Sequence, residues 1–143
     1  MTCPALRRLL YVDDDPDLRE IVTMALQDLG GFALQVCASG SEAIQKVPAF
    51  DPQLVLLDVM MPGMDGPTTL LTLRRNSRFS TTAVVFITAN TQRREVAHLI
   101  GLGAVDVIAK PFDPMTLHER ISGIWNNYCD AAAASVADWR PTR

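Results

Sequence analysis

The sequence has few cysteines, few aromatic residues and no long apolar run. Its three cysteines, Cys3, Cys37 and Cys129, are far apart and show neither a CxxC pattern nor Cys/His ligand spacing. This pattern argues against a disulfide framework and against a zinc site. We therefore expect reduced thiols and a cytoplasmic protein.

The chain also lacks an excess of basic charge. Its 13 Lys and Arg residues are outnumbered by 16 Asp and Glu residues, and no basic block stands out. We therefore expect no direct nucleic-acid binding by this chain. No apolar run approaches the length of a membrane span, and the apolar stretch after Arg8 is too short for a signal-peptide core. The 143 residues, 48% of them hydrophobic, suit one globular domain.

What the chain does have is a rhythm of short apolar runs separated by longer helix-like segments. The runs are Leu9–Val12, Ala33–Val36, Leu54–Leu57, Val84–Ile87 and Val105–Ile108. Runs that are apolar at nearly every position are typical of parallel strands that are covered on both faces.

The intervening segments carry helix start and stop signals. Asp15-Pro16 and the capping box Ser39–Glu42 predict two helix starts. Gly30-Gly31 ends the first helix, and Pro48 and Pro52 are expected to stop the second. Further helices are expected from about Gly66 to Arg75, from Asn90 or Thr91 to Leu99, and from Asp113-Pro114 to about Asn127.

Five strands and five helices in strict alternation predict an α/β fold with a doubly wound parallel sheet. Ligands of such folds bind outside the carboxyl ends of the strands. Polar residues follow four of the predicted strands at that edge: Asp13 and Asp14, Asp58, Thr88 and Lys110. Carboxylates gathered there would repel one another, and a divalent cation such as Mg²⁺ would relieve the repulsion.

Taken singly, these residues have plainer interpretations. An aspartate at a strand end is often a helix cap, Thr88 suits a turn hydroxyl and Lys110 suits a surface lysine. Asp58 is harder to explain in this way, because it directly follows a fully apolar run and calls for a polar cleft.

Four motif blocks together resemble the receiver domains of response regulators. They are Tyr11–Pro16, Leu57–Gly66, Ile87–Ala89 and Ala109–Phe112, and the match covers roughly residues 7 to 127. The resemblance implies a flavodoxin-like (βα)5 sheet with strand order 2-1-3-4-5. It also implies a signalling module of two-component or phosphorelay systems, rather than an enzyme.

By this resemblance, Asp58 is the phosphoryl acceptor and the site uses Mg²⁺. Asp14 would be a side-chain metal ligand, Asp13 would contribute mainly through bound water, and the backbone carbonyl of Met60 would complete the protein ligands with Asp58. Lys110 would supply positive charge, aimed by a cis bond to Pro111.

The resemblance also implies a switching mechanism, with Thr88 as the switch hydroxyl. A histidine kinase or a histidine phosphotransfer protein would donate the phosphoryl group. A downstream protein would read the surface of the fourth helix, fifth strand and fifth helix. Many receivers have Tyr or Phe three residues before the lysine, whereas this chain has Val107. Switching is then left to backbone movement, or this surface is used less.

An alternative function is that of an aspartate-nucleophile phosphatase. Such enzymes need a second Asp two residues after the nucleophile, and here that residue is Met60, which argues against this class of enzyme.

The residues near Asp58 also bear on the lifetime of a phosphoryl group. Met60 and Asn90 border the path of an attacking water in this family. Because Met60 offers that water no hydrogen bond, we hypothesise slow self-hydrolysis.

We assign residues 1–127 to the receiver domain and residues 128–143 to a short C-terminal tail, which we expect to be flexible. A stand-alone receiver is favoured. The alternative is a fragment of a larger regulator with a DNA-binding or enzymatic output domain.

Overall fold

The computed structural model describes the backbone of residues 4–138 and the side chains of residues 4–131. Its centre is a five-stranded parallel sheet with strand order β2-β1-β3-β4-β5, as predicted. The strands are β1 (Arg8–Val12), β2 (Ala33–Cys37), β3 (Leu54–Asp58), β4 (Ala83–Thr88) and β5 (Asp106–Ala109).

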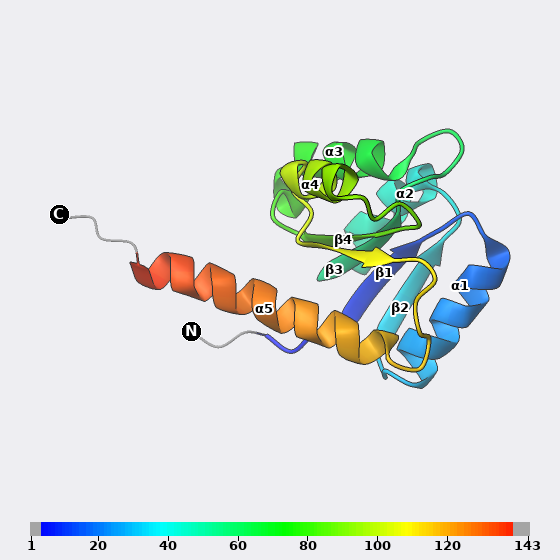
Figure 1. Cartoon of the computed structure of the whole chain (residues 1–143), viewed down its shortest axis with the longest axis horizontal. Coiled ribbons are helices and arrows are strands. Elements are labelled where there is room, and N and C mark those ends of the chain that lie inside the picture. Colours follow the sequence, from blue (N-terminus) through cyan, green and yellow to red (C-terminus); the bar gives the residue numbers. More distant parts are fainter. Residues whose placement is uncertain (1–3, 139–143) are drawn as a thin grey trace.

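Helices cover both faces of the sheet (Figure 1). One face packs against α1, the π-helical turn η1 and α5, and the other packs against α2, α3 and α4. The bounds are α1 (Pro16–Thr23), η1 (Met24–Asp28), α2 (Gly40–Phe50), α3 (Gly66–Arg75), the 3-10 turn η2 (Ser77–Phe79), α4 (Arg93–Gly101) and α5 (Leu117–Asp138).

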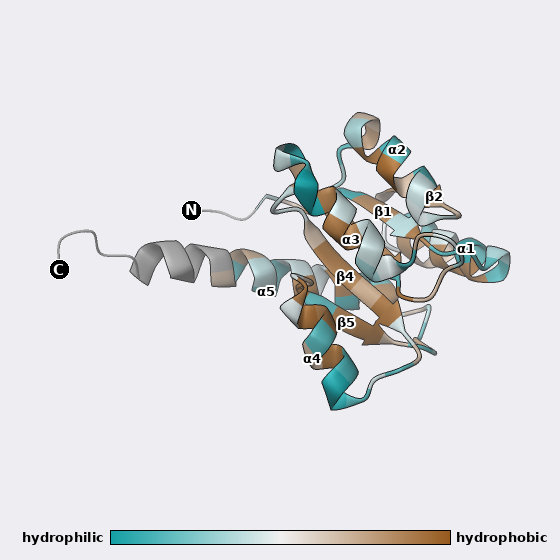
Figure 2. Cartoon of the chain, turned by 90° about the horizontal axis from the view of Figure 1, so that it is seen from above, coloured by the Kyte–Doolittle hydropathy of each residue, from teal (hydrophilic) through white to brown (hydrophobic). Residues whose placement is uncertain are grey.

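Two hydrophobic clusters explain why the strands are apolar at every position. Along β1, Leu9 and Tyr11 pack into the cluster under α1 and α5, whereas Leu10 and Val12 pack into the cluster under α2, α3 and α4. All residues of β3 and β4 are buried, and β4 is hydrophobic along its length in Figure 2. Two-sided burial therefore replaces the alternation of a half-exposed strand.

Three helix boundaries differ from the prediction. The helix α2 continues through Pro48 to Phe50, because Phe50 packs on the core and Asp51 ends the helix in a left-handed conformation with φ of 54°. α5 begins at Leu117 instead of Asp113, since Met115 N donates to Asp113 Oδ1 (2.9 Å) in a preceding turn. α5 then continues past Asn127 to Asp138, into the predicted tail, whose remainder lies outside the described residues.

Two smaller shifts concern β5 and α4. β5 runs one residue later than predicted, at Asp106–Ala109, and α4 begins at Arg93 after the extended residue Gln92. Among the helices that the structure describes, none has the length and apolar character needed to cross a membrane.

The expectation of reduced cysteines is wrong for Cys129, which is disulfide-bonded. Cys37 is a free, buried thiol, and burial raises its pKa to about 12. Cys3 lies outside the described residues.

Candidate functional site

Strand register gathers the polar residues that follow the strands. Val12 of β1 pairs with Leu57, Asp58 pairs with Ile87, and Thr88 pairs with Ala109. The carboxyl ends of β1, β3, β4 and β5 therefore lie side by side at one edge of the sheet. This register brings together the predicted site residues Asp13, Asp14, Asp58, Thr88 and Lys110.

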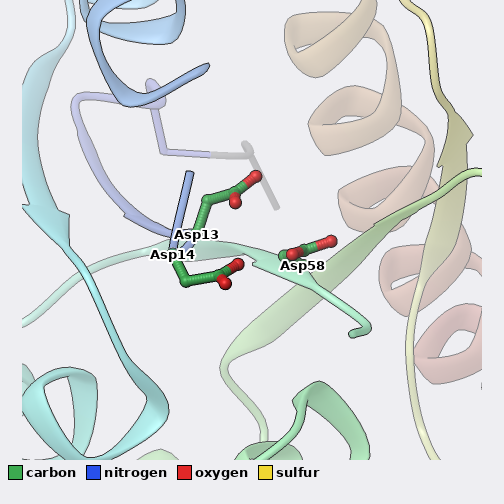
Figure 3. Close-up of side chains that lie close together, drawn as sticks. All are labelled: Asp13, Asp14 and Asp58. Atoms are coloured by element: carbon green, nitrogen blue, oxygen red, sulfur yellow. The ribbon is translucent and has the colours of Figure 1, made fainter. Parts of the chain in front are cut away.

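Three carboxylates form the centre of the site (Figure 3). Asp13 and Asp58 are buried and Asp14 is exposed, and each has an oxygen within 4.8 Å of an oxygen of the other two. Three clustered anionic oxygen ligands are the donor set that hard divalent cations bind. The residues present therefore fit an acidic metal site.

Lys110 connects the acidic cluster to the end of β5. Its Nζ donates to Asp58 Oδ1 at 3.0 Å and to Asp13 Oδ2 at 3.4 Å. Burial lowers the pKa of Lys110, but its hydrogen bond to Asp58 and the charge of Asp13 outweigh burial and leave the pKa raised. Burial, together with the charges of Asp13 and Asp14, raises the pKa of Asp58 despite the opposing hydrogen bond and charge of Lys110. The expected cis bond between Lys110 and Pro111 is present.

Asp13 is held by several neighbours besides Lys110. The hydroxyl of Tyr11 donates to Asp13 Oδ2 at 2.7 Å, and Asp15 N donates to Asp13 Oδ1 at 3.0 Å. The guanidinium of Arg19 donates to the backbone oxygen of Asp13 at 2.9 Å. Tyr11 is a site residue that was not among those predicted from the sequence. Its signal was a lone hydroxyl in an apolar strand, two residues before Asp13 and so on the same side of the chain.

Thr88 lies beside Asp58, at the wall of a cavity of about 420 Å³. Its Oγ1 accepts a hydrogen bond from Asn90 N at 3.0 Å, which ties it to the loop before α4. The cavity is lined by Asp58, Met60, Thr88, Ala89, Asn90 and Lys110. Met60 is 80% exposed, so its thioether stands in solvent at the rim. The role of the Met60 carbonyl stays a prediction.

The turn after Asp58 depends on Gly66. Its N donates to Val59 O at 2.9 Å, and a Cβ at this position would clash with the carbonyl oxygen of Asp58. Asp65 caps α3 by accepting from Thr68 N at 2.9 Å. The Asp65-Gly66 pair therefore lets α3 start close behind the site.

Val107 occupies the position where many receivers have an aromatic ring. It is 8% exposed and packs in the cluster that contains Leu99 and Phe86. The residue is thus part of the core beneath α4, and it has no ring that could move between an exposed and a buried position.

Comparisons with known proteins agree with this geometry. Residues 9–122 match the family model of the response regulator receiver domain. The chain is 40% identical over 115 residues to the DNA-binding response regulator MtrA of Mycolicibacterium smegmatis. The aligned region covers 80% of this chain and 49% of that protein. The chain spans about half the length of the curated relatives it matches first.

Solved structures show the same fold. The chemotaxis response regulator CheY4 of Vibrio cholerae superposes with a TM-score of 0.78 at 29% identity, covering 84% of this chain and 99% of that one. The BeF3-activated DrrB receiver domain superposes with a TM-score of 0.71 at 25% identity, covering 85% and 99%. With its acidic cluster at the carboxyl edge of a 2-1-3-4-5 sheet, this chain belongs to the response regulator receiver domain family, a group of signalling modules rather than enzymes.

Proposed function

We propose that the chain is a phosphorylation-dependent switch that accepts a phosphoryl group on Asp58. The donor would be a histidine kinase or a histidine phosphotransfer protein of a two-component system. The observation that supports this most directly is the position of Asp58. It is a buried carboxylate that lies beside two other carboxylates, contacts one ammonium group and borders an open cavity.

The residues present supply what phosphoryl transfer requires, which is positioning and charge neutralisation. An Asp58 oxygen would form the new P–O bond as the bond between phosphorus and the donor nitrogen breaks, the nitrogen keeping the electron pair. Lys110 would neutralise charge on the phosphoryl oxygens. Asp13, Asp14, Asp58 and the Met60 carbonyl would hold Mg²⁺, which when bound supplies positive charge at the same oxygens.

Thr88 would transmit the change to α4 through a short chain of hydrogen bonds. Thr88 Oγ1 accepts from Asn90 N at 3.0 Å, and Asn90 Oδ1 accepts from Gln92 N at 3.2 Å. Gln92 is the residue that precedes the first turn of α4. A Thr88 hydroxyl drawn toward a phosphoryl group would therefore pull on the start of α4. This link does not need an aromatic ring at position 107, where this chain has valine.

The surface formed by α4, β5 and α5 would present the change to a downstream protein. Arg93 and Arg94 are exposed at the start of α4, and Ile100 is 42% exposed near its end. Figure 2 shows hydrophilic residues at the start of α4 and hydrophobic ones further along. A mixed polar and apolar helix of this kind suits a reversible protein contact.

A second candidate is that this receiver regulates an attached DNA-binding domain. The specific observation is its similarity to a DNA-binding response regulator that is about twice as long as the matched region. The mass of the native polypeptide, purified from its source, distinguishes this arrangement from a stand-alone receiver.

The test of the proposed function is the intact mass of the protein after incubation with acetyl phosphate. We expect one added phosphoryl group that requires both Mg²⁺ and Asp58, and that is absent from Asp58→Asn. Asp51→Asn is the matched control, because Asp51 is an exposed aspartate at the end of α2, where the connection to β3 begins. Absence of an adduct, with acetyl phosphate and with a phosphorylated donor protein, would contradict the proposal.

A further inference from the structure

Tyr11 is a buried hydroxyl group that contacts the acidic site directly. The residue is fully buried in β1, among the side chains beneath α1 and α5. Its hydroxyl donates to Asp13 Oδ2 at 2.7 Å. Burial and the nearby carboxylates raise the pKa of Tyr11.

The hydrogen bonds to Asp13 differ from those at the other two carboxylates. Asp13 has a donor on each oxygen, Tyr11 on Oδ2 and Asp15 N on Oδ1. Asp14 is exposed to solvent, and Asp58 receives Lys110 on Oδ1. Asp13 is therefore the carboxylate whose charge and orientation the protein itself fixes most completely.

Lys110 and Tyr11 share one oxygen atom of Asp13. Lys110 Nζ lies 3.4 Å from Asp13 Oδ2, beyond the usual range of a strong charge-assisted bond, and 3.0 Å from Asp58 Oδ1. The tyrosine hydroxyl at 2.7 Å already satisfies the shared oxygen. This arrangement leaves Lys110 on the side of Asp58.

We propose that Tyr11 is a positioning residue of the phosphoacceptor site. Its hydroxyl occupies Asp13 Oδ2, which keeps that oxygen from drawing Lys110 or a bound cation away from Asp58. The inference rests on the proposed function, because it assigns Tyr11 a part in metal binding and phosphoryl transfer at that site.

Tyr11→Phe removes the hydroxyl and leaves the ring in place. Asp13 then has one donor fewer in a fully buried position, so its freed oxygen turns to the cations nearby. We expect Tyr11→Phe to bind Mg²⁺ more tightly than the wild type, with a half-saturating concentration reduced about threefold or more, since the freed oxygen becomes available as a ligand. We also expect the phosphorylation rate at saturating Mg²⁺ and acetyl phosphate to fall about threefold or more, since Lys110 is drawn toward Asp13.

These opposite directions separate positioning from simple damage to the fold. A variant that merely disturbed the site would bind Mg²⁺ more weakly and react more slowly. Calorimetric titration of the unphosphorylated protein with Mg²⁺ gives the affinity without any reaction. The rate of phosphoryl incorporation at saturating Mg²⁺ gives the second quantity. Tyr128→Phe is the matched control, because the Tyr128 hydroxyl donates to Thr81 O at 2.8 Å, away from the site.

Unchanged Mg²⁺ affinity and an unchanged saturated rate in Tyr11→Phe would overturn the inference, as would weaker Mg²⁺ binding. If Tyr11→Phe fails to fold, the Mg²⁺ affinities of Asp13→Asn and of Asp13→Asn combined with Tyr11→Phe decide, and a difference between these two affinities would overturn the inference. Loss of the hydroxyl should then have no further effect, because Tyr11 acts through the Asp13 carboxylate. Failure of the wild-type protein to bind Mg²⁺ or accept phosphate would instead contradict the proposed function.

Discussion

The Nζ atom of Lys110 lies 3.0 Å from Oδ1 of Asp58, although the two residues are 52 positions apart in the chain. The contact joins the ends of β3 and β5, which are not neighbours in the sheet. Lys110 crosses the end of β4 to reach Asp58, and it lies 3.4 Å from Asp13 as well. One ammonium group thus offsets the charge of two buried carboxylates.

Replacing Lys110 by Met should have opposite effects on metal affinity and on reaction rate. The three carboxylates lose their protein cation, so calorimetry should show tighter Mg²⁺ binding. The phosphorylation rate with acetyl phosphate should fall about tenfold or more, because a positive charge that neutralises the phosphoryl oxygens is missing. Lys46→Met, on the exposed side of α2, is the control. Equal rates in the two variants would contradict this role of Lys110.

The ionised form of Asp58 should destabilise the metal-free protein. Burial raises the pKa of Asp58 above its ordinary value of 3.8. A group with a raised folded-state pKa contributes stability that is fully present below its ordinary pKa and is lost as pH rises through the folded pKa.

Asp58→Asn removes that loss. Its free energy of unfolding at pH 7, in the presence of a metal chelator, should exceed that of the wild type, because asparagine carries no buried charge. The difference should shrink as pH falls toward 3.8, where wild-type Asp58 is protonated. Urea unfolding at a series of pH values measures this, with Asp51→Asn as the control for an exposed aspartate. A difference that stays constant with pH would mean that Asp58 ionisation is not its cause.

Asn90→Ala should weaken the link between Thr88 and α4. The side chain of Asn90 accepts from Gln92 N at 3.2 Å, and the alanine variant keeps the backbone N–H that donates to Thr88. Phosphorylation of Asp58 should then proceed, while hydrogen-exchange protection at the start of α4 changes less than in the wild type. Gln92→Ala, which retains the backbone donor, is the control. Wild-type changes in α4 after phosphorylation of Asn90→Ala would exclude this link.

Met60→Asn should shorten the lifetime of phosphorylated Asp58. Met60 is 80% exposed at the rim of the cavity that Asp58 lines, and its thioether offers only a weak hydrogen-bond acceptor to a passing water. A carboxamide could orient that water for attack, and we expect decay about threefold faster or more. Met115→Asn is the control, because Met115 is an exposed methionine in the turn before α5, away from the cavity. An unchanged decay rate in Met60→Asn would refute the idea.

Local pattern was enough to predict the sheet and the residues at its edge. Each strand is short and apolar throughout, so the runs around Leu9 and Leu54 are visible without any tertiary information. Parallel strands end at a common edge, so Asp13, Asp58 and Lys110 could be assigned to one site from their places after the strands. The cis bond before Pro111 followed from the family resemblance.

Other features depend on contacts between distant parts of the chain. Pro48 lies inside α2 because Phe50 packs on the core, and packing outweighs the lost hydrogen bond of one proline. The disulfide of Cys129 depends on a spatial approach that cysteine spacing does not encode.

The sequence by itself determined the alternation of strands and helices and the identity of the acidic residues. Both depend on residues that are close together in the chain, namely fully apolar runs and the polar residues that directly follow them. Only the tertiary structure decided which donors those acids receive. The sequence shows Tyr11 as a lone hydroxyl in an apolar strand, but only the structure places that hydroxyl 2.7 Å from Asp13. The contact between Lys110 and Asp58 likewise depends on the sheet order, in which a single strand, β4, separates β3 from β5 and the lysine side chain reaches across its end. Hydrogen-bond partners depend on distances of a few tenths of an ångström, which are fixed when the strands and helices pack together.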